Sequence, residues 1–232
     1  PAFFDVSVVS SNNETAAGST QTFDVQVTNT GDQSGTQTLT LDWGSGQYTD
    51  STQVTLDGGD STTEQLSVTL SGSQAMDTYG VTVTSDDDTD SMQAKVGPER
   101  SLDKTQVSPG GTVQVTISGE VSSSSELNLA DAWSPDADGD ANVVSSTFTR
   151  DFTITSAGDV VIAFQEDQGT FELVYEITVP SDSGGQTYQW EGETSQLEID
   201  GVSFPILGDQ QFDVTSATAV ASMSDRADAV IR

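Results

Sequence analysis

Residues 16–30 read AAGSTQTFDVQVTNT, and this stretch decides the fold class. A glycine-containing turn is followed by Phe23, Val25 and Val27, which alternate with polar residues and so predict a half-buried β-strand. The stretch SPGGTVQVTISGEVS at 108–122 contains the same kind of turn followed by an alternating strand. The two stretches indicate that one strand plan occurs twice along the chain.

A second pair of similar stretches supports this repeat. SVTLSGSQAMDTYGVTV (67–83) and YEITVPSDSGGQTYQWE (175–191) each contain a strand, a polar turn and a Thr-Tyr pair that opens another strand. The order of the two elements is the same in both halves, but their spacing is longer in the second. We therefore predict an all-β chain of two tandem β-sandwich domains, 1–97 and 98–216, with an insertion in the second domain and a C-terminal tail at 217–232.

Tyrosines mark corresponding positions in the two halves. Tyr79 and Tyr188 stand where immunoglobulin-like sandwiches place a tyrosine corner, with the ring in the core and the hydroxyl bonded to nearby backbone. Val81 replaces the cysteine that such domains usually have. Polar turns such as DGGD and SDDDTD separate short alternating segments. We place strands near 3–9, 20–29, 36–43, 52–57, 62–70, 77–84 and 90–96, and in the second half near 112–118, 125–130, 143–150, 151–155, 159–164, 171–179, 187–194, 196–199 and 210–215.

Both halves resemble known surface modules. ETAAGSTQTFDVQVTNTGDQSGTQTLTL is similar to the bacterial and archaeal cell-adhesion-related domain, CARDB, whose hallmark is a strand ending in V-x-N-T-G, here Val27 to Gly31. RSLDKTQVSPGGTVQVTI, LADAWSP and EITVPSDSGGQTYQW resemble repeats of haloarchaeal surface proteins. The resemblance covers about residues 3–96 and 100–215. It implies tandem immunoglobulin-like sandwiches in a surface setting, and neither motif contains a catalytic or ligand residue.

The charge of the chain points to its environment. The sequence contains 37 acidic and 6 basic residues, for a formal net charge of −31. At about 1 M salt the Debye length falls to about 3 Å, so like charges on a surface scarcely repel one another. We therefore expect a protein of an extremely halophilic archaeal system. The acidic charge argues against nucleic-acid binding, and the spread of the acids along the chain argues against an acidic mimic of nucleic acid.

The residue types present exclude several chemistries. The chain has no histidine and no cysteine, which removes Ser-His-Asp and Cys-His sites and ordinary zinc sites. Two carboxylates can hydrolyse a glycoside, but nearly every loop here contains carboxylates, so the pattern selects no site. No apolar run reaches the roughly 18 residues that a membrane span needs. We expect a protein that is not an enzyme, requires no cofactor and does not insert into a membrane.

Asp136, Asp138 and Asp140 alternate within SPDADGDANV and form a candidate cation site. Ala141 and Thr147 stand where an EF-hand loop requires glycine and glutamate, so the segment is not an EF-hand. A looser site for Ca²⁺ or Mg²⁺ remains as the functional interpretation. The similar SDDDTD at 85–90 is interpreted as a solvated turn.

The tryptophans suggest a second kind of site. Trp190 alternates with Tyr188 and is expected in the core. Trp43 and Trp133 lie near turns, where exposed rings would stack on a sugar. We predict these two residues as contacts to a host surface glycan.

The scarce basic residues gather at two places. Lys95, Arg100 and Lys104 surround the predicted domain boundary, where we expect them to neutralise acids and fix the interdomain angle. The apolar residues of the tail have a spacing that would line one side of a helix. Consecutive strand residues face opposite ways, so one ring of the N-terminal Phe-Phe pair should lie outside its core. The predicted docking residues are Phe3, Phe4, Met223, Arg226, Val230, Ile231 and Arg232.

The first residues, PAFFDVSVV, lack the features of a secretion signal. A product that begins Met-Pro would be made in the host cytoplasm without export. We therefore expect a non-catalytic structural protein of a haloarchaeal virus particle, as a capsid turret or decoration or as a tail or fibre component. Its expected partners are other virion proteins, further copies of itself, and a host surface glycan or protein. A haloarchaeal cell-envelope adhesin is the alternative, and a carbohydrate-binding module is the third interpretation. All three stay open because the sandwich fold alone does not distinguish these functions.

Overall fold

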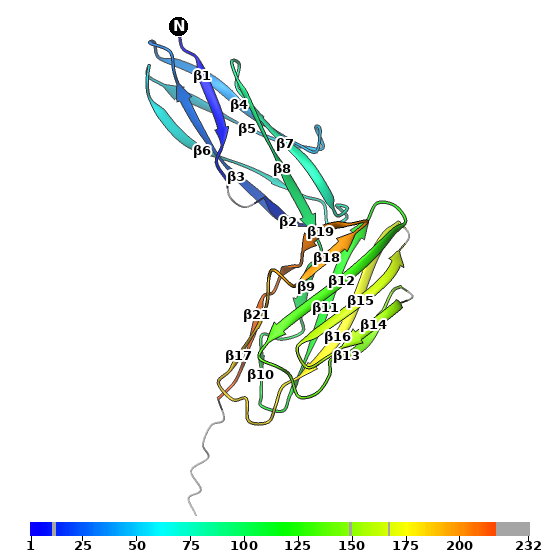
Figure 1. Cartoon of the computed structure of the whole chain (residues 1–232). Helices are drawn as coiled ribbons and strands as arrows, with labels where there is room; N and C mark the ends of the chain where they lie inside the picture. The colour runs from blue at the N-terminus through cyan, green and yellow to red at the C-terminus, as the bar shows by residue number, and fades with distance from the viewer. Residues whose placement is uncertain (11–12, 149, 167, 217–232) are drawn as a thin grey trace, which may run out of the picture.

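The structure, a computed structural model, describes residues 1–10, 13–148, 150–166 and 168–216, and every regular element in those ranges is a β-strand. Two β-sandwiches lie end to end (Figure 1). The N-terminus lies at the end of the first sandwich that is remote from the second. The prediction of an all-β chain of tandem sandwiches is confirmed. Within the described residues, no helix has the length and apolar character needed to cross a membrane.

The first sandwich packs a sheet of order β1-β3-β6 against a sheet of order β2-β8-β7-β4-β5. Adjacent strands are antiparallel except for β2 and β8, which are parallel. The strands are β1 (Phe4–Val8), β2 (Glu14–Ala16), β3 (Thr20–Asn29), β4 (Gly35–Trp43), β5 (Tyr48–Leu56), β6 (Ser61–Thr69), β7 (Asp77–Thr84) and β8 (Thr89–Gly97).

Alternation along β3 supplies one wall of the first core. Phe23, Val25 and Val27 are fully buried, and they pack in one cluster with Leu39 and Leu41 from the opposite sheet. The polar residues between them face outward. Burial of each such side chain stabilises the fold by about 1.5–3 kcal/mol, so the period-2 pattern specifies which face of the strand turns inward.

The second sandwich has one five-stranded sheet of order β13-β16-β11-β9-β20. The other sheet has the order β10-β21-β17-β12-β15-β14, and β18 and β19 extend it beside β12. The strands are β9 (Glu99–Leu102), β10 (Gln106–Val107), β11 (Thr112–Val121), β12 (Ser125–Ser134), β13 (Asn142–Ser146), β14 (Arg150–Thr155), β15 (Asp159–Glu166), β16 (Gly169–Thr178), β17 (Thr187–Trp190), β18 (Gln196–Ile199), β19 (Val202–Pro205), β20 (Leu207–Gly208) and β21 (Gln211–Val214).

The V-x-N-T-G motif has a structural role that its sequence did not reveal. Asn29 is fully buried, and its side-chain oxygen accepts hydrogen bonds from the N–H groups of Phe3 and Gly31, both at 3.1 Å. Its amide donates to the carbonyl oxygens of Gln33 at 2.8 Å and Leu56 at 3.1 Å. One side chain thus ties β1, the β3–β4 turn and the end of β5 together. A Cβ on Gly31 would lie 2.1 Å from the Pro1 carbonyl oxygen, which explains the glycine.

The two predicted tyrosine corners differ. The Tyr79 hydroxyl donates to the Ala75 carbonyl at 2.8 Å, four residues upstream, and this confirms the first corner. The Tyr188 ring is buried, but its hydroxyl donates to the Asp136 carbonyl at 3.0 Å, 52 residues away. The second tyrosine therefore anchors a distant loop rather than its own turn.

Candidate functional site: the junction between the two sandwiches

The connection between the sandwiches is very short. β8 ends at Gly97 and β9 begins at Glu99, so only Pro98 separates them. The Pro98 carbonyl accepts a hydrogen bond from the N–H of Leu207 at 2.9 Å. A Cβ on Gly97 would lie 2.5 Å from the Pro205 carbonyl oxygen, so only glycine allows this approach. The connection is packed against the second sandwich and differs from a free linker.

Met76 crosses the junction. It precedes β7 of the first sandwich, yet it is 5 % exposed and belongs to the core cluster of the second. Its N–H donates to the Glu120 carbonyl at 2.8 Å. A Cβ on Gly119 would approach the Met76 sulfur to 2.6 Å and the Phe171 ring to 2.9 Å, so the thioether fills the space that Gly119 leaves open. One side chain that precedes β7 of the first sandwich thus packs in the core of the second.

Lys95 also joins the two sandwiches. Its Nζ donates to the Ser203 carbonyl at 3.0 Å and lies 5.9 Å from the centroid of the Phe204 ring. Both partners belong to β19 of the second sandwich. The structure therefore places Lys95 at the junction, where it binds a carbonyl oxygen and an aromatic face.

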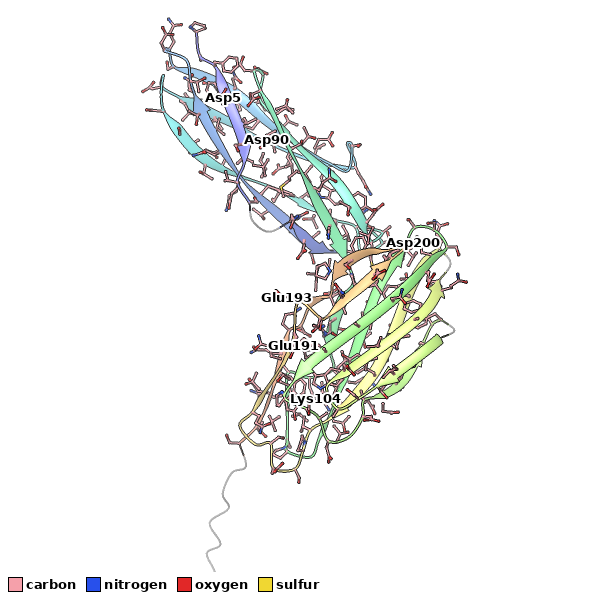
Figure 2. The ribbon with its side chains drawn as sticks, viewed as in Figure 1. Asp5, Asp90, Lys104, Glu191, Glu193 and Asp200 are labelled. Atoms are coloured by element: carbon pink, nitrogen blue, oxygen red, sulfur yellow. The ribbon has the colours of Figure 1, made fainter. Side chains whose placement is uncertain are left out.

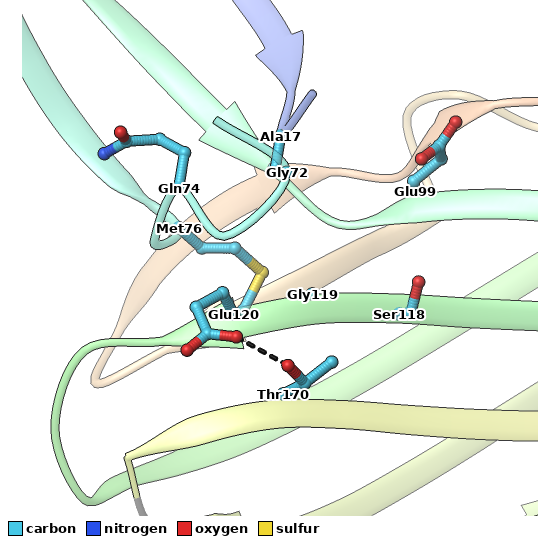
Figure 3. Close-up of a pocket in the computed structure, with 10 residues that line it drawn as sticks. Ala17, Gly72, Gln74, Met76, Glu99, Ser118, Gly119, Glu120 and Thr170 are labelled. Carbon is cyan, nitrogen blue, oxygen red and sulfur yellow. Dashed lines mark hydrogen bonds between the residues drawn. The ribbon is translucent and has the colours of Figure 1, made fainter. Parts of the chain in front are cut away.

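A small pocket lies at the junction (Figure 3). Glu120 points into it and accepts a hydrogen bond from the Thr170 hydroxyl at 2.6 Å. The volume of the pocket is about 80 Å³, far below the roughly 300–1,000 Å³ of small-molecule sites. The pocket is a gap in the packing between the two sandwiches and is too small for a substrate. Its lining residues are Ala17, Gly72, Gln74, Met76, Gly97, Glu99, Ser118, Gly119, Glu120 and Thr170.

Arg100 does not have the predicted role. It is 1 % exposed, and its guanidinium forms a two-pronged ion pair with the equally buried Asp131, with Nε donating at 3.2 Å. A third donor reaches the Asp209 carbonyl at 3.0 Å. The prediction of an interdomain residue was wrong because β9 joins the sheet and its alternation turns Arg100 into the second core.

Aromatic residues complete this buried network. The Tyr175 hydroxyl donates to Asp131 at 2.5 Å and accepts from the Trp190 indole at 3.2 Å. The Arg100 guanidinium lies 4.5 Å from the centroid of the Trp190 ring. Burial, with the Asp131 charge as a smaller cause, raises the pKa of Tyr175 well above its ordinary value of 10.0. The phenol therefore stays protonated and donates, and the sealed network supports the fold rather than chemistry.

Lys104 is the third residue of the predicted interdomain set. Its Nζ pairs with Asp103 at 3.2 Å, and both side chains are about 40 % exposed. Figure 2 shows Lys104 in the second sandwich, away from the junction. It therefore contacts no acid of the first sandwich, and only Lys95 of the three residues bridges the two.

The tryptophans predicted to contact a glycan are buried. Trp43 is 0 % and Trp133 is 3 % exposed. The Trp43 indole donates to Gln21 at 3.2 Å, and its ring stacks on Tyr79 at 4.4 Å. The Trp133 indole donates to the Ala157 carbonyl at 3.0 Å. The prediction was wrong because both residues follow the inward phase of their strands although they lie near turns.

Of the predicted docking residues, only Phe3 and Phe4 lie within the described part of the chain. Phe3 is 45 % exposed, but Phe4 is fully buried and belongs to the first core, which removes it as a docking residue. This outcome confirms the prediction that one of the two rings, here that of Phe3, lies outside the core of its own sandwich. The tail residues Met223, Arg226, Val230, Ile231 and Arg232 lie outside the described residues.

The predicted cation site is not assembled. In the part of the chain that the structure describes, no three acidic residues converge on a point that could hold a metal ion, and this includes Asp136, Asp138 and Asp140. The backbone of this loop is instead used for the fold. The Asp138 N–H donates to the Thr178 carbonyl at 2.7 Å, in addition to the Tyr188 contact with Asp136.

Three aspartates of SDDDTD have a role that sequence reasoning missed. Asp87, Asp88 and Asp90 accept hydrogen bonds from the N–H groups of Phe4, Val6 and Val8, at 3.0, 3.0 and 2.8 Å. These N–H groups lie on the edge of β1 that faces away from β3. The carboxylates therefore cap an open sheet edge and connect the two sheets.

Comparison with known proteins identifies no family for this chain, because no protein-family model and no curated protein matches it. Among solved structures, the chain is similar to the type II cohesin dyad from the adaptor ScaA scaffoldin of Acetivibrio cellulolyticus, at 8% identity and a TM-score of 0.36 over 93% of this chain and 99% of that chain.

Two further solved structures show the same level of likeness. Red sea bream transglutaminase matches at 11% identity and a TM-score of 0.33, over 92% of this chain and 31% of that chain. A type II cohesin domain from the cellulosome of Acetivibrio cellulolyticus matches at 13% identity and a TM-score of 0.34, over 50% of this chain and 94% of that chain. Likeness at this level carries no inference about function, and the resemblance to CARDB and haloarchaeal surface repeats stays a prediction.

Proposed function

We propose that the protein is a non-catalytic structural spacer on the outer surface of a haloarchaeal virus particle, where it holds its two ends apart. The observation that carries the proposal is the junction. A one-residue connection at Pro98, the buried Met76 and the Lys95 contact hold two end-to-end sandwiches in one arrangement. A module that transmits position needs such a joint, whereas a flexible tether does not.

The buried network of the second sandwich supports a role without catalysis. The most strongly perturbed group, Tyr175, lies in a fully buried network, where no substrate can reach it. Perturbed groups at active sites lie in accessible clefts, so this network is structural.

The charge of −31 supports a setting in multimolar salt. Under this proposal, one end attaches to the particle and the other projects toward the host surface. The N-terminus, next to the exposed Phe3, marks one end. In the sequence, the segment 217–232 follows the second sandwich.

The proposal is tested by immunogold labelling of an infected halophile culture and of purified particles. Label on particles, with none on uninfected cells, is the expected result. Label on the envelopes of uninfected cells would overturn the viral setting and favour a cell-envelope adhesin with the same spacer geometry.

The spacer geometry has its own test. Small-angle X-ray scattering of the full chain in multimolar salt should give one narrow distribution of lengths. The variant Gly97→Val, whose side chain meets the Pro205 carbonyl, should broaden that distribution. Gly80→Val is the matched control for adding a side chain at a glycine, since nothing lies within 4 Å of its Cβ and its φ is not positive. A broad distribution in the unaltered protein would remove the basis of the proposal.

A further inference from the structure

One side of the second sandwich consists of two sheet edges. β13 ends the five-stranded sheet and β14 ends the other sheet, and only residues 147–149 connect the two strands. Figure 1 shows both strands along the same side of the sandwich. Phe148 stacks on Phe164 with ring centroids 3.7 Å apart and closes the core between the two strands. We call β13 and β14 together the β13–β14 edge.

The β13–β14 edge exposes apolar side chains. Val144 on β13 is 48 % exposed and Ile154 on β14 is 51 % exposed. Ile154 pairs with Val161, which lies between the buried Val160 and Ile162 and therefore faces outward. Ile154 thus also faces outward, at the border of the sheet.

The backbone of the β13–β14 edge is uncapped. Within the described residues, no side chain hydrogen-bonds to the backbone of Asn142–Ser146 or of Thr153–Thr155. Two edges of the first sandwich differ, since three aspartates cap β1 and the Asp50 carboxylate accepts from the Ser67 N–H of β6 at 2.8 Å. β14 keeps regular pairing with β15 from Phe152 to Thr155, beyond the register shift at Arg150. An uncapped edge with regular geometry can pair with another strand.

The charge of the β13–β14 edge indicates which kind of molecule can pair with it. Residues 141–158 contain one acidic and one basic residue, Asp151 and Arg150, so the segment is neutral in a chain of net charge −31. Two copies of this chain repel one another through most of their surfaces, but two neutral edges can approach without that penalty. Arg150 is also the only basic residue between Lys104 and Arg226, and it lies on the same strand as Ile154. A second copy therefore offers both a neutral apolar edge and an acidic surface around it.

We propose that the β13–β14 edge is the surface through which two copies of this chain associate, with β14 of one copy antiparallel to β14 of the other. This is an isologous contact, in which the same edge serves both partners. The Ile154 and Val144 side chains then leave water, and the sheet continues from one copy into the next. High salt favours the contact because it screens the acids around the edge. The inference does not depend on the viral setting.

The test is sedimentation equilibrium of the full chain in multimolar salt over a range of protein concentrations. The unaltered protein should form dimers. Ile154→Asp should weaken the dimer by at least about tenfold, because an aspartate would face the same acid on the partner. Val9→Asp is the matched control, since Val9 is equally exposed, at 51 %, but lies in the first sandwich, and its dimer should be unchanged.

Hydrogen exchange adds a readout that a folding defect would not imitate. The amides of residues 150–155 should exchange more slowly at high than at low protein concentration, while those of β1 should not respond. A protein that stays monomeric at every concentration overturns the proposal. Equal association of Ile154→Asp and Val9→Asp overturns it as well, and so does association that is lost only on deletion of 217–232.

Discussion

The backbone N–H of Val6 donates to the Asp88 carboxylate at 3.0 Å, across 82 positions of sequence and from one sheet of the first sandwich to the other. Asp87 and Asp90 make the same contact with the neighbouring N–H groups of this edge. This acidic turn therefore stabilises the fold through specific hydrogen bonds, in addition to any effect on solubility. The contribution of individual acidic residues to stability can be tested by replacing them one at a time.

Removing the Asp88 cap should destabilise the first sandwich. Asp88→Ala leaves the Val6 N–H without its partner, so the thermal midpoint should fall, as measured by circular dichroism in multimolar salt. Asp86→Ala is the control, because it removes an equal charge from the same turn and, among the described contacts, the Asp86 carboxylate caps no strand. Equal midpoints for the two variants would mean that charge, and not capping, decides the stability.

The same cap should make stability depend on pH in the acid range. The N–H groups of Val6 and Thr89 lower the pKa of Asp88 below its ordinary value of 3.8. A lowered pKa in the folded state means that the stabilisation is complete above 3.8 and is lost as the pH falls through the folded-state value. The difference in the free energy of unfolding between the unaltered protein and Asp88→Asn should therefore shrink as the pH falls below 3.8 and through the folded-state pKa of Asp88. A difference that is constant across the acid range would contradict the assignment.

The buried ion pair should matter far more than exposed pairs. Arg100→Met leaves Asp131 charged and unpaired in the core, and we expect a loss of about 3–5 kcal/mol in the free energy of unfolding. The double variant Arg100→Met, Asp131→Leu should recover part of that loss, because neither charge is then buried alone. Lys104→Met, which breaks the exposed pair with Asp103, should change stability by about 1 kcal/mol or less. Chemical denaturation in high salt measures all three values.

Met76 should couple the two sandwiches. Met76→Ala removes a buried side chain from the second core, with an expected cost of about 2 kcal/mol or more. Because the residue belongs to the first sandwich, its loss should also separate the unfolding of the two sandwiches into two steps. Met92→Ala is the control, since Met92 packs only against the first core. Hydrogen exchange followed in each sandwich separately distinguishes coupled from independent unfolding.

Dilution of salt should unfold the protein. Below about 0.5 M salt the repulsion among the acids returns as screening falls, and circular dichroism should show loss of the β-sheet signal. A fold that is unchanged in dilute buffer would contradict the halophilic interpretation.

Most of the strands could be predicted from alternation. The predicted segments 20–29 and 77–84 coincide with β3 and β7, because each strand has one buried face that needs an apolar residue at every second position. The strands β2, β9, β10, β19 and β20 were missed. Each has only two to four residues, which contain too little of the pattern, and β2, β10 and β20 pair in parallel with strands that are distant in the sequence. The segment 187–194 ended early, at Trp190, where the chain turns.

The site residues were harder to predict than the strands. Arg100, Trp43 and Trp133 were assigned from their chemistry and their closeness to boundaries or turns. Each faces inward in the structure, because a shift of one residue in a strand moves a side chain to the opposite face. Position along the chain therefore said where these residues lie, but not which way they point.

The sequence by itself determined the all-β class and the repeated strand plan, because the periodicity of a strand is visible in neighbouring residues. The net charge, which is a sum over the sequence, further predicts a need for high salt. Only the tertiary structure decided that Asp88 caps Val6, that Met76 enters the second core and that Arg100 is buried beside Asp131. These contacts join residues that are far apart in the chain, and they depend on which sheet edges and which sandwich ends meet. These contacts form only when the strands pack into sheets and the two sandwiches pack against each other, so the strand pattern alone does not specify them.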